Sequence, residues 1–274
     1  MNYADELEKK LSKGVYAKYY CEENGECKYF SECKKKLRNK VPKYKCDRVR
    51  IGTNYGQPGI PKILCVGLEG ICGQDILNEE KIVKGYLKPS KAACNAHYNG
   101  VIYVLEYILS AFIDECKKPV SLISNNNSDR NKVTDKYALT NFYRCAFAPK
   151  DNPSLVKNLS HSKGMREHCQ EILIDEIKTL KPDILIVQSS QWPENLWNIM
   201  KEEFGFNKAE IGFGNHDQTS VFKGKINEML LVLVCTYHGA YAKFKSKEYI
   251  ENKLNPVLDK AIELVKNQNA VKNS

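Results

Sequence analysis

The sequence predicts an α/β fold in which helices cover both faces of a parallel sheet. Short apolar runs alternate along the chain with longer segments of helical periodicity, which is the pattern of βαβ units. Each run is continuously apolar, as expected of strands that are buried on both faces. We therefore expect a three-layer α/β/α sandwich around a four-stranded parallel sheet, with the strands Ile63–Val66, Ala138–Phe142, Ile184–Val187 and Met229–Cys235.

Helical patterns lie before, between and after these strands. The first is amphipathic, the second is nearly all apolar and is expected to be buried, and the last is a long terminal helix. The predicted helices are Leu7–Tyr20, Val101–Cys116, Met165–Leu180, Glu194–Phe204 and Lys247–Val265. Ser220–Met229, with Lys-Gly at its centre, is predicted to form a hairpin that leads into the last strand.

Composition divides the chain into three parts. Residues 1–55 form a Cys-rich, Lys-rich segment expected to pack on the core, residues 56–268 form the α/β/α domain, and residues 269–274 form a flexible polar tail. The hydrophobic content of 42% supports a real core. The longest apolar runs are too short to span a membrane, and the charged N-terminus lacks the apolar stretch of a signal peptide. We therefore expect a soluble cytoplasmic protein, associated with the nucleoid if its source is prokaryotic.

The positive charge of the chain favours a polyanionic partner, with nucleic acid first. Lys and Arg number 42 against 33 Asp and Glu, which gives a formal net charge of +9. One cluster mixes lysines with aromatic rings that could pack against bases. Its members, our candidate DNA-binding residues, are Tyr241, Lys243, Phe244, Lys245 and Lys247. The alternative is that these lysines are only the solvated start of the terminal helix.

Eleven cysteines are many for a protein with no export signal. In that setting metal ligation is a better interpretation of clustered cysteines than disulfide bonding. The first fifth of the chain holds Cys21, Cys27, Cys33 and Cys46. Three others have apolar surroundings and are expected to be inert core residues: Cys65, Cys116 and Cys235.

Polar residues lie near the end of, or just past, three of the four predicted strands. Glu69 comes just after the first strand, Asn141 lies near the end of the second, and His238 comes just past the fourth. Because parallel strands end at the same edge of a sheet, these side chains are expected to converge. The sequence thus predicts a site that combines a carboxylate, a carboxamide and an imidazole.

The order of these motifs resembles that of the uracil-DNA glycosylase superfamily, in particular its iron–sulfur branch. Gly67–Gly70 (Gly-Leu-Glu-Gly) stands where the superfamily has a Gly-x-(Asp/Asn/Ala)-Pro-Gly-like motif. Thr140–Cys145 (Thr-Asn-Phe-Tyr-Arg-Cys) is similar to the Thr-Asn-x-x-Lys-Cys of the branch. Cys169 on a later helix, Lys181–Asp183 (Lys-Pro-Asp) and His238–Ala240 (His-Gly-Ala, in place of His-Pro-Ser) follow in the same order.

This resemblance implies a DNA glycosylase that hydrolyses the N-glycosidic bond of a flipped uracil or modified base and leaves an abasic site. Glu69 would orient or deprotonate water and stabilise the cationic sugar. His238 would donate a hydrogen bond to the departing base, and Asn141 would bind its Watson–Crick edge. The role would be repair or defence against modified foreign DNA.

The base would also contact the glycine motif and an aromatic floor. Gly67 and Gly70 are the glycines of that motif, and Tyr98 is our candidate for the floor among Tyr86, His97 and Tyr98. Simple packing at the start of its helix is the alternative role for Tyr98. The implied partner is DNA with an extruded or single-stranded base, with no membrane and no obligatory protein partner.

The resemblance also implies a [4Fe–4S] cluster held by four cysteines. Cys145 and Cys169 would supply two ligands, and Cys33 and Cys46 the others, because these two lead directly into the core; Cys27 is the reserve. The alternative is a structural zinc site of the four N-terminal cysteines, although their C-x5-C-x5-C-x12-C spacing lacks the usual close pair. With zinc, the protein could be a non-catalytic nucleic-acid-binding protein.

Overall fold

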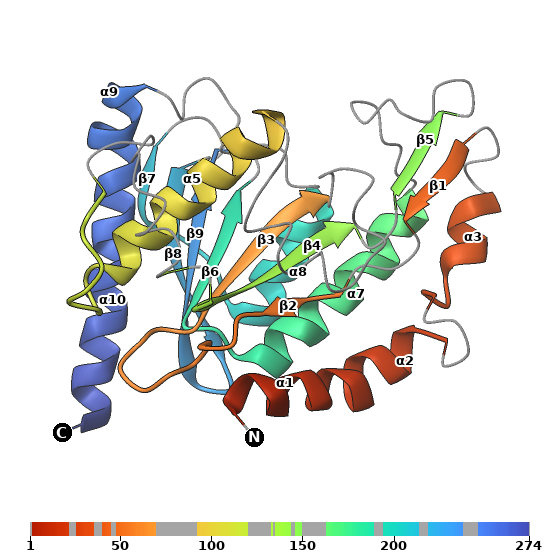
Figure 1. The fold of residues 1–274 in the computed structure, drawn as a ribbon, viewed down its shortest axis with the longest axis horizontal. Coiled ribbons are helices and arrows are strands. Elements are labelled where there is room, and N and C mark those ends of the chain that lie inside the picture. Colours follow the sequence, from red (N-terminus) through yellow and green to blue (C-terminus); the bar gives the residue numbers. More distant parts are fainter. Residues whose placement is uncertain are drawn as a thin grey trace.

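The structure is a computed structural model, drawn as a ribbon in Figure 1. It describes residues 2–21, 26–35, 40–44, 48–69, 92–119, 133, 135–143, 146–149, 163–188, 194–213, 219–237 and 246–273. Within these ranges, only the backbone is described for residues 40–44, 68–69, 92–99, 143, 146–149, 163–166, 194–196 and 271–273.

The described helices and strands alternate along most of the chain. The helices are α1 (Tyr3–Leu11), η1 (Ser12–Tyr16, π-helical), α2 (Ala17–Tyr19), α3 (Phe30–Lys35), α5 (Ala92–Leu109), α7 (Lys163–Leu180), α8 (Glu194–Phe204), α9 (Lys247–Tyr249), η6 (Ile250–Leu254, π-helical) and α10 (Asn255–Asn273). The strands are β1 (Lys40–Tyr44), β2 (Arg50–Ile51), β3 (Ile63–Glu69), β4 (Tyr137–Tyr143), β5 (Ala146–Pro149), β6 (Ile184–Gln188), β7 (Ala209–Phe213), β8 (Thr219–Ile226) and β9 (Met229–Thr236).

The main sheet has seven strands in the order β2-β4-β3-β6-β9-β8-β7. The four predicted strands are its centre, β4-β3-β6-β9, and neighbouring strands in this group are parallel. The prediction of a sheet with only four strands is wrong, because antiparallel strands extend it at both edges: β2 beside β4, and β8 and β7 beyond β9. A separate two-stranded sheet joins β1 to β5.

The hairpin between β8 and β9 adds the first of the two strands beyond β9. Its turn is Asn227-Glu228, where both residues have positive φ (46° and 65°) between the paired residues Ile226 and Met229. Two residues with positive φ form the tight turn that suits the twist of a hairpin. The predicted hairpin is confirmed, but its Lys223-Gly224 centre lies inside β8 and not in the turn.

Each face of the sheet is buried by its own set of helices. On one face, side chains such as Val66 and Val187 pack in a cluster with residues of α1, α7 and α8. On the other, Cys65 and Ile186 pack with residues of α5 and α10. Helices therefore flank both faces, and the expected α/β class with a buried parallel core is confirmed (Figure 1).

The helices follow the predicted ranges with shifted ends. The second predicted helix, α5, begins at Ala92 and stops at Leu109, short of Cys116. Just past its end the Ser110 hydroxyl donates to the Tyr107 carbonyl (2.8 Å), a local bond that competes with the helical pattern. At the other end of the chain, α10 continues through residues 269–273. Among the described helices, none is long and apolar enough to cross a membrane.

A fully buried carboxylate joins the N-terminal helices to the sheet. Glu176 of α7 accepts hydrogen bonds from the Tyr16 hydroxyl (2.9 Å) and from the Thr140 hydroxyl of β4 (2.8 Å). The Tyr16 hydroxyl accepts in turn from the Val49 backbone N–H (2.8 Å). One side chain thus connects the N-terminal segment, a helix and a central strand.

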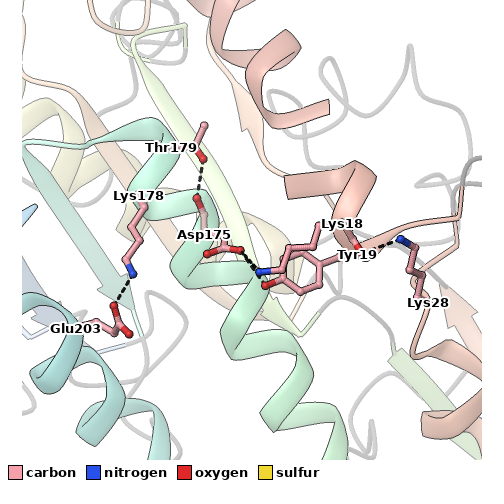
Figure 2. Close-up of polar contacts among 7 residues, drawn as sticks. All are labelled: Lys18, Tyr19, Lys28, Asp175, Lys178, Thr179 and Glu203. Atoms are coloured by element: carbon pink, nitrogen blue, oxygen red, sulfur yellow. Dashed lines mark hydrogen bonds and ion pairs between the residues drawn. The ribbon is translucent and has the colours of Figure 1, made fainter. Parts of the chain in front are cut away.

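Polar contacts at the surface continue this attachment (Figure 2). The Tyr19 hydroxyl and the Lys18 ammonium both donate to Asp175 of α7, at 2.8 and 3.0 Å. The Lys28 ammonium donates to the carbonyls of Ala17 and Lys18 and so ties the segment around residue 28 to α2. Residues from the first fifth of the chain are therefore packed on the α/β core.

We predict that Tyr16→Phe lowers the free energy of unfolding by about 1–3 kcal/mol. The change leaves a buried carboxylate oxygen and the Val49 N–H without the hydroxyl that they bind, and buried polar groups deprived of a partner are costly. Tyr19→Phe is the matched control, because its partner Asp175 is partly exposed and water can replace the hydroxyl. Urea denaturation of both variants measures the difference. Equal losses of unfolding free energy in the two variants would contradict a larger contribution from the hydrogen bond between Tyr16 and Glu176.

Candidate functional site

The four parallel strands each bring one polar or glycine residue into a row at their carboxyl ends. Asn141 of β4 is the Cα partner of Gly67 of β3. The β3–β6 ladder pairs Val66 with Val187, so that Gln188 is the next position beside Gly67. The row continues to Thr236 on β9, the partner of Gln188. Cross-strand neighbours in a sheet project from the same face, so these four positions share one face.

The row lies on the face covered by α5 and α10. Side chains alternate along a strand, and the Thr140 hydroxyl reaches Glu176 of α7 on the opposite face. Its neighbour Asn141 therefore faces α5. The odd-numbered residues before it on β4, including Leu139, belong to the α5 core cluster, which agrees with this assignment.

Asn141 lies directly over Gly67. A Cβ atom built on Gly67 would be 2.5 Å from the Asn141 Oδ1 atom, closer than real Cβ contacts allow. Both residues are buried, with Asn141 1% exposed. The structure therefore brings together two of the predicted base-binding residues. It also shows why the position is glycine: the carboxamide fills the space of a side chain.

The first predicted strand does not stop at its glycine. Strand β3 continues through Gly67 to Glu69, whose Cα partner is Tyr143. Glu69 thus ends the strand at the carboxyl edge of the sheet, as the sequence predicts for a residue of the site. Its side chain is outside the described part of the chain, as is the side chain of Tyr98 on α5.

Gln188 is a buried polar residue that the sequence analysis did not single out. It ends β6, is 2% exposed, and occupies the row between Gly67 and Thr236. The signal was present in the sequence, because a glutamine closes an otherwise apolar strand, Ile184–Val187. The same reasoning that selected Asn141 at the end of the second strand would have selected Gln188 at the end of the third.

The chain is anchored on both sides of the segment that starts with His238. The Tyr237 backbone N–H donates to the Tyr249 hydroxyl (3.5 Å), and the two rings meet edge to face at 5.4 Å. Ser246 caps α9 by accepting from the Tyr249 N–H (3.4 Å). Burial raises the pKa of Tyr249 to about 12, so this hydroxyl stays protonated at neutral pH. One tyrosine therefore contacts both residues that flank segment 238–245.

Several predicted residues lie outside the described part of the chain. These are Gly70, His238, Tyr241, Lys243, Phe244, Lys245, Cys46 and Cys145. Of the predicted DNA-binding lysines, Lys247 is described: it is exposed and forms an ion pair with Glu251 at 3.6 Å. Its predicted contact with DNA stays a prediction.

Contacts around His168 bring the helix of Cys33 against the helix of Cys169. The His168 ring stacks on Tyr29 with centroids 3.6 Å apart, and its Nε2 atom lies 3.2 Å from the Glu32 carboxylate. Cys33 follows Glu32 in α3 and Cys169 follows His168 in α7; both cysteines are 5% exposed and belong to the same core cluster. Two predicted metal ligands from distant parts of the sequence thus sit on packed segments.

The other described cysteines differ in their surroundings. Cys27, the reserve ligand, is buried in the same cluster as Cys33. Cys65 and Cys116 are buried on the α5 side, and burial raises the pKa of the Cys65 thiol, as expected for an inert core residue; Cys235 is only partly buried. Within the described ranges, no three His, Cys, Asp or Glu side chains form a group that could hold a metal ion.

Comparison with known protein-family models and with curated proteins finds no match to this chain. The resemblance to the uracil-DNA glycosylase superfamily therefore stays a prediction from the motifs.

We predict that Gly67→Ala destabilises the protein by about 1–3 kcal/mol, as overpacking of a buried site typically does. The new methyl group must displace the Asn141 carboxamide. In an Asn141→Ala background that obstacle is gone, so the same change should cost much less; urea denaturation of the four proteins of this double-mutant cycle measures the coupling. Gly14→Ala is the control, since its Cβ would meet nothing within 4 Å. An equal cost in both backgrounds contradicts the predicted contact.

Proposed function

We propose that the protein is a DNA glycosylase that removes an extruded base and leaves an abasic site. The observation that carries the proposal is the contact of Asn141 with Gly67 at the carboxyl edge of the parallel sheet. The connection after β3 leads to α5 on one face, whereas the connection after β6 leads to α8 on the other. Ligands of open α/β sheets bind where neighbouring connections diverge in this way.

The site residues match the demands of N-glycosidic bond hydrolysis. The sugar gains oxocarbenium character as the base departs with negative charge. Glu69, at the end of β3, would activate the attacking water and stabilise that cation. Asn141 would hold the base edge, since a carboxamide both donates and accepts. His238, the residue after the anchored Tyr237, would donate to the base as negative charge develops.

Charge and chain path support DNA as the polymer that carries the base. The net charge of +9 favours a polyanion. Strand β9, which precedes segment 238–245 in the sequence, ends at the same edge of the sheet as Glu69 and Asn141, because β3, β4 and β9 run parallel. In this proposal Tyr241 or Phe244 fills the gap left by the extruded base, and Lys243, Lys245 and Lys247 bind phosphates.

We further propose that the cysteines hold a [4Fe–4S] cluster with a structural role. Cys33 and Cys169 fit such a site, because both thiols are buried on packed helices in an apolar and aromatic environment. The remaining two, Cys46 and Cys145, are close chain neighbours of Tyr44 and Ala146, which are paired in the β1–β5 ladder. When bound, the cluster would cross-link the N-terminal segment to the core; no step of the hydrolysis requires it.

The catalytic proposal predicts that Glu69→Gln loses about 10²–10⁴-fold of the rate of base removal, the usual loss when a general base is removed. The assay incubates the protein with oligonucleotides that carry uracil or other modified bases and measures abasic sites. Glu228→Gln, on the exposed β8–β9 turn, is the control and should keep full activity. Turnover by Glu69→Gln near the wild-type rate would remove Glu69 from the mechanism, and no abasic site from any base would reject the proposed function.

The cluster proposal predicts brown protein after anaerobic purification, with about four iron atoms per chain. Cys33→Ser and Cys169→Ser should each lose the visible absorption and the iron, and should lower the unfolding temperature. Cys21→Ser separates the two metal hypotheses: it should keep the iron, whereas a zinc site of the four N-terminal cysteines would need Cys21 and not Cys169. Colourless protein with one zinc per chain, retained by Cys169→Ser and lost by Cys21→Ser, would contradict the cluster.

A further inference from the structure

Gln188 has a buried carboxamide whose hydrogen bonds are not accounted for by the described structure. Its side chain is 2% exposed, and neither its Nε2 nor its Oε1 atom has a hydrogen-bond partner among the described residues. A carboxamide has two donor hydrogens and an accepting oxygen, and burying them without partners is costly. Folded proteins rarely keep such a group unless it serves a purpose.

The position of Gln188 suggests that purpose. It ends β6, which lies beside β3 in the sheet. The connections that follow these two strands lead to helices on opposite faces of the sheet, α5 and α8. In the row across the sheet it flanks Gly67 on one side, as Asn141 does on the other. Gly67, which lies between them, has no side chain. Neighbouring strands are about 4.8 Å apart, so the Cα atoms of Asn141 and Gln188 are about 10 Å apart.

The surroundings of Gln188 make a purely structural role a poor explanation. Thr236, the next member of the row, is also fully buried, but its hydroxyl donates to the Tyr237 carbonyl at 3.1 Å. Thr140 and Glu176 on the opposite face satisfy one another. Of the side chains at this edge, Gln188 is the buried one whose nitrogen and oxygen both lack a partner in the described ranges.

We propose that Gln188 is a specificity-determining residue that binds a polar edge of the extruded base, with Asn141 binding another. This inference rests on the proposed glycosylase function and adds to it the chemistry of recognition. A carboxamide complements any edge that places a donor next to an acceptor, such as the cyclic –CO–NH– of uracil or hypoxanthine. Two carboxamides in one row would distinguish bases that differ by a single polar group.

The test compares base preference with stability in the same variants. Gln188→Leu and Gln188→Met replace the carboxamide by apolar groups of similar size. Because they remove a buried polar group without a described partner, they should keep or raise the unfolding temperature. They should slow removal of the preferred base about 10- to 100-fold, the typical effect of losing a hydrogen bond that a site was built to make, and should narrow the preference between bases.

Gln188→Glu should change which bases the protein prefers, in a direction that can be predicted. A carboxylate only accepts hydrogen bonds. This variant should therefore remove more slowly the bases that present a carbonyl to residue 188, and its relative rate should rise on bases that present an amino group. The substrates are single-stranded oligonucleotides that each carry one uracil, hypoxanthine, cytosine or adenine. Gln57→Leu is the control, because Gln57 is exposed and lies before β3, at the opposite edge of the sheet.

The outcomes separate this inference from the proposed function. Wild-type protein that excises no base overturns both. Active wild-type protein whose Leu, Met and Glu variants keep the same base profile overturns the role of Gln188 alone. A clear fall in the unfolding temperature of both apolar variants also overturns it, because it would show that the carboxamide is bonded within the protein. A changed profile with unchanged stability supports it.

Discussion

The carboxylate of Glu176 is the contact on which the arrangement of the other parts depends. It is fully buried, and both of its oxygens accept hydrogen bonds, one from Tyr16 of the N-terminal segment and one from Thr140 of β4. Breaking a buried polar network of this kind costs more than its separate bonds suggest. The position of the N-terminal segment, the orientation of α7 and the face presented by β4 are therefore linked. Because Thr140 faces α7, the next residue, Asn141, must face the proposed site.

The parallel register then determines which residues can form the site. A shift by one residue in any of the central strands would turn its side chains to the other face. In the observed register Asn141 meets a glycine, and Gln188 occupies the other side of that glycine. A side chain at residue 67 would collide with Asn141, so the glycine and the asparagine depend on each other. The sheet thus limits the site to a small set of residues at its carboxyl edge, whatever the ligand is.

Much of this arrangement could be predicted from the sequence, because its central part follows from local pattern. The four apolar runs are the four parallel strands, and α8 has the predicted bounds. The edge strands were missed for physical reasons. Strand β2 has only two residues, and β7 has no continuous apolar run. The sequence could have indicated Gln188 by its place at the end of an apolar strand, but the lack of hydrogen-bond partners for its buried carboxamide among the described residues is visible only once the strands are paired.

Helix α7 keeps the proposed metal cluster apart from the proposed base-binding site. Cys169 and Glu176 are seven residues apart, which is two helical turns, so both lie on the buried side of the helix with about 10 Å between them along its axis. Glu176 is the residue that contacts β4, whereas Cys169 is near the other segment, α3. A cluster bound at Cys169 would therefore lie along the helix from the site and not beside the row of Asn141 and Gln188. It would act on the site by holding α7 and, through Glu176, the strand that carries Asn141, and it would take no direct part in recognition of the base.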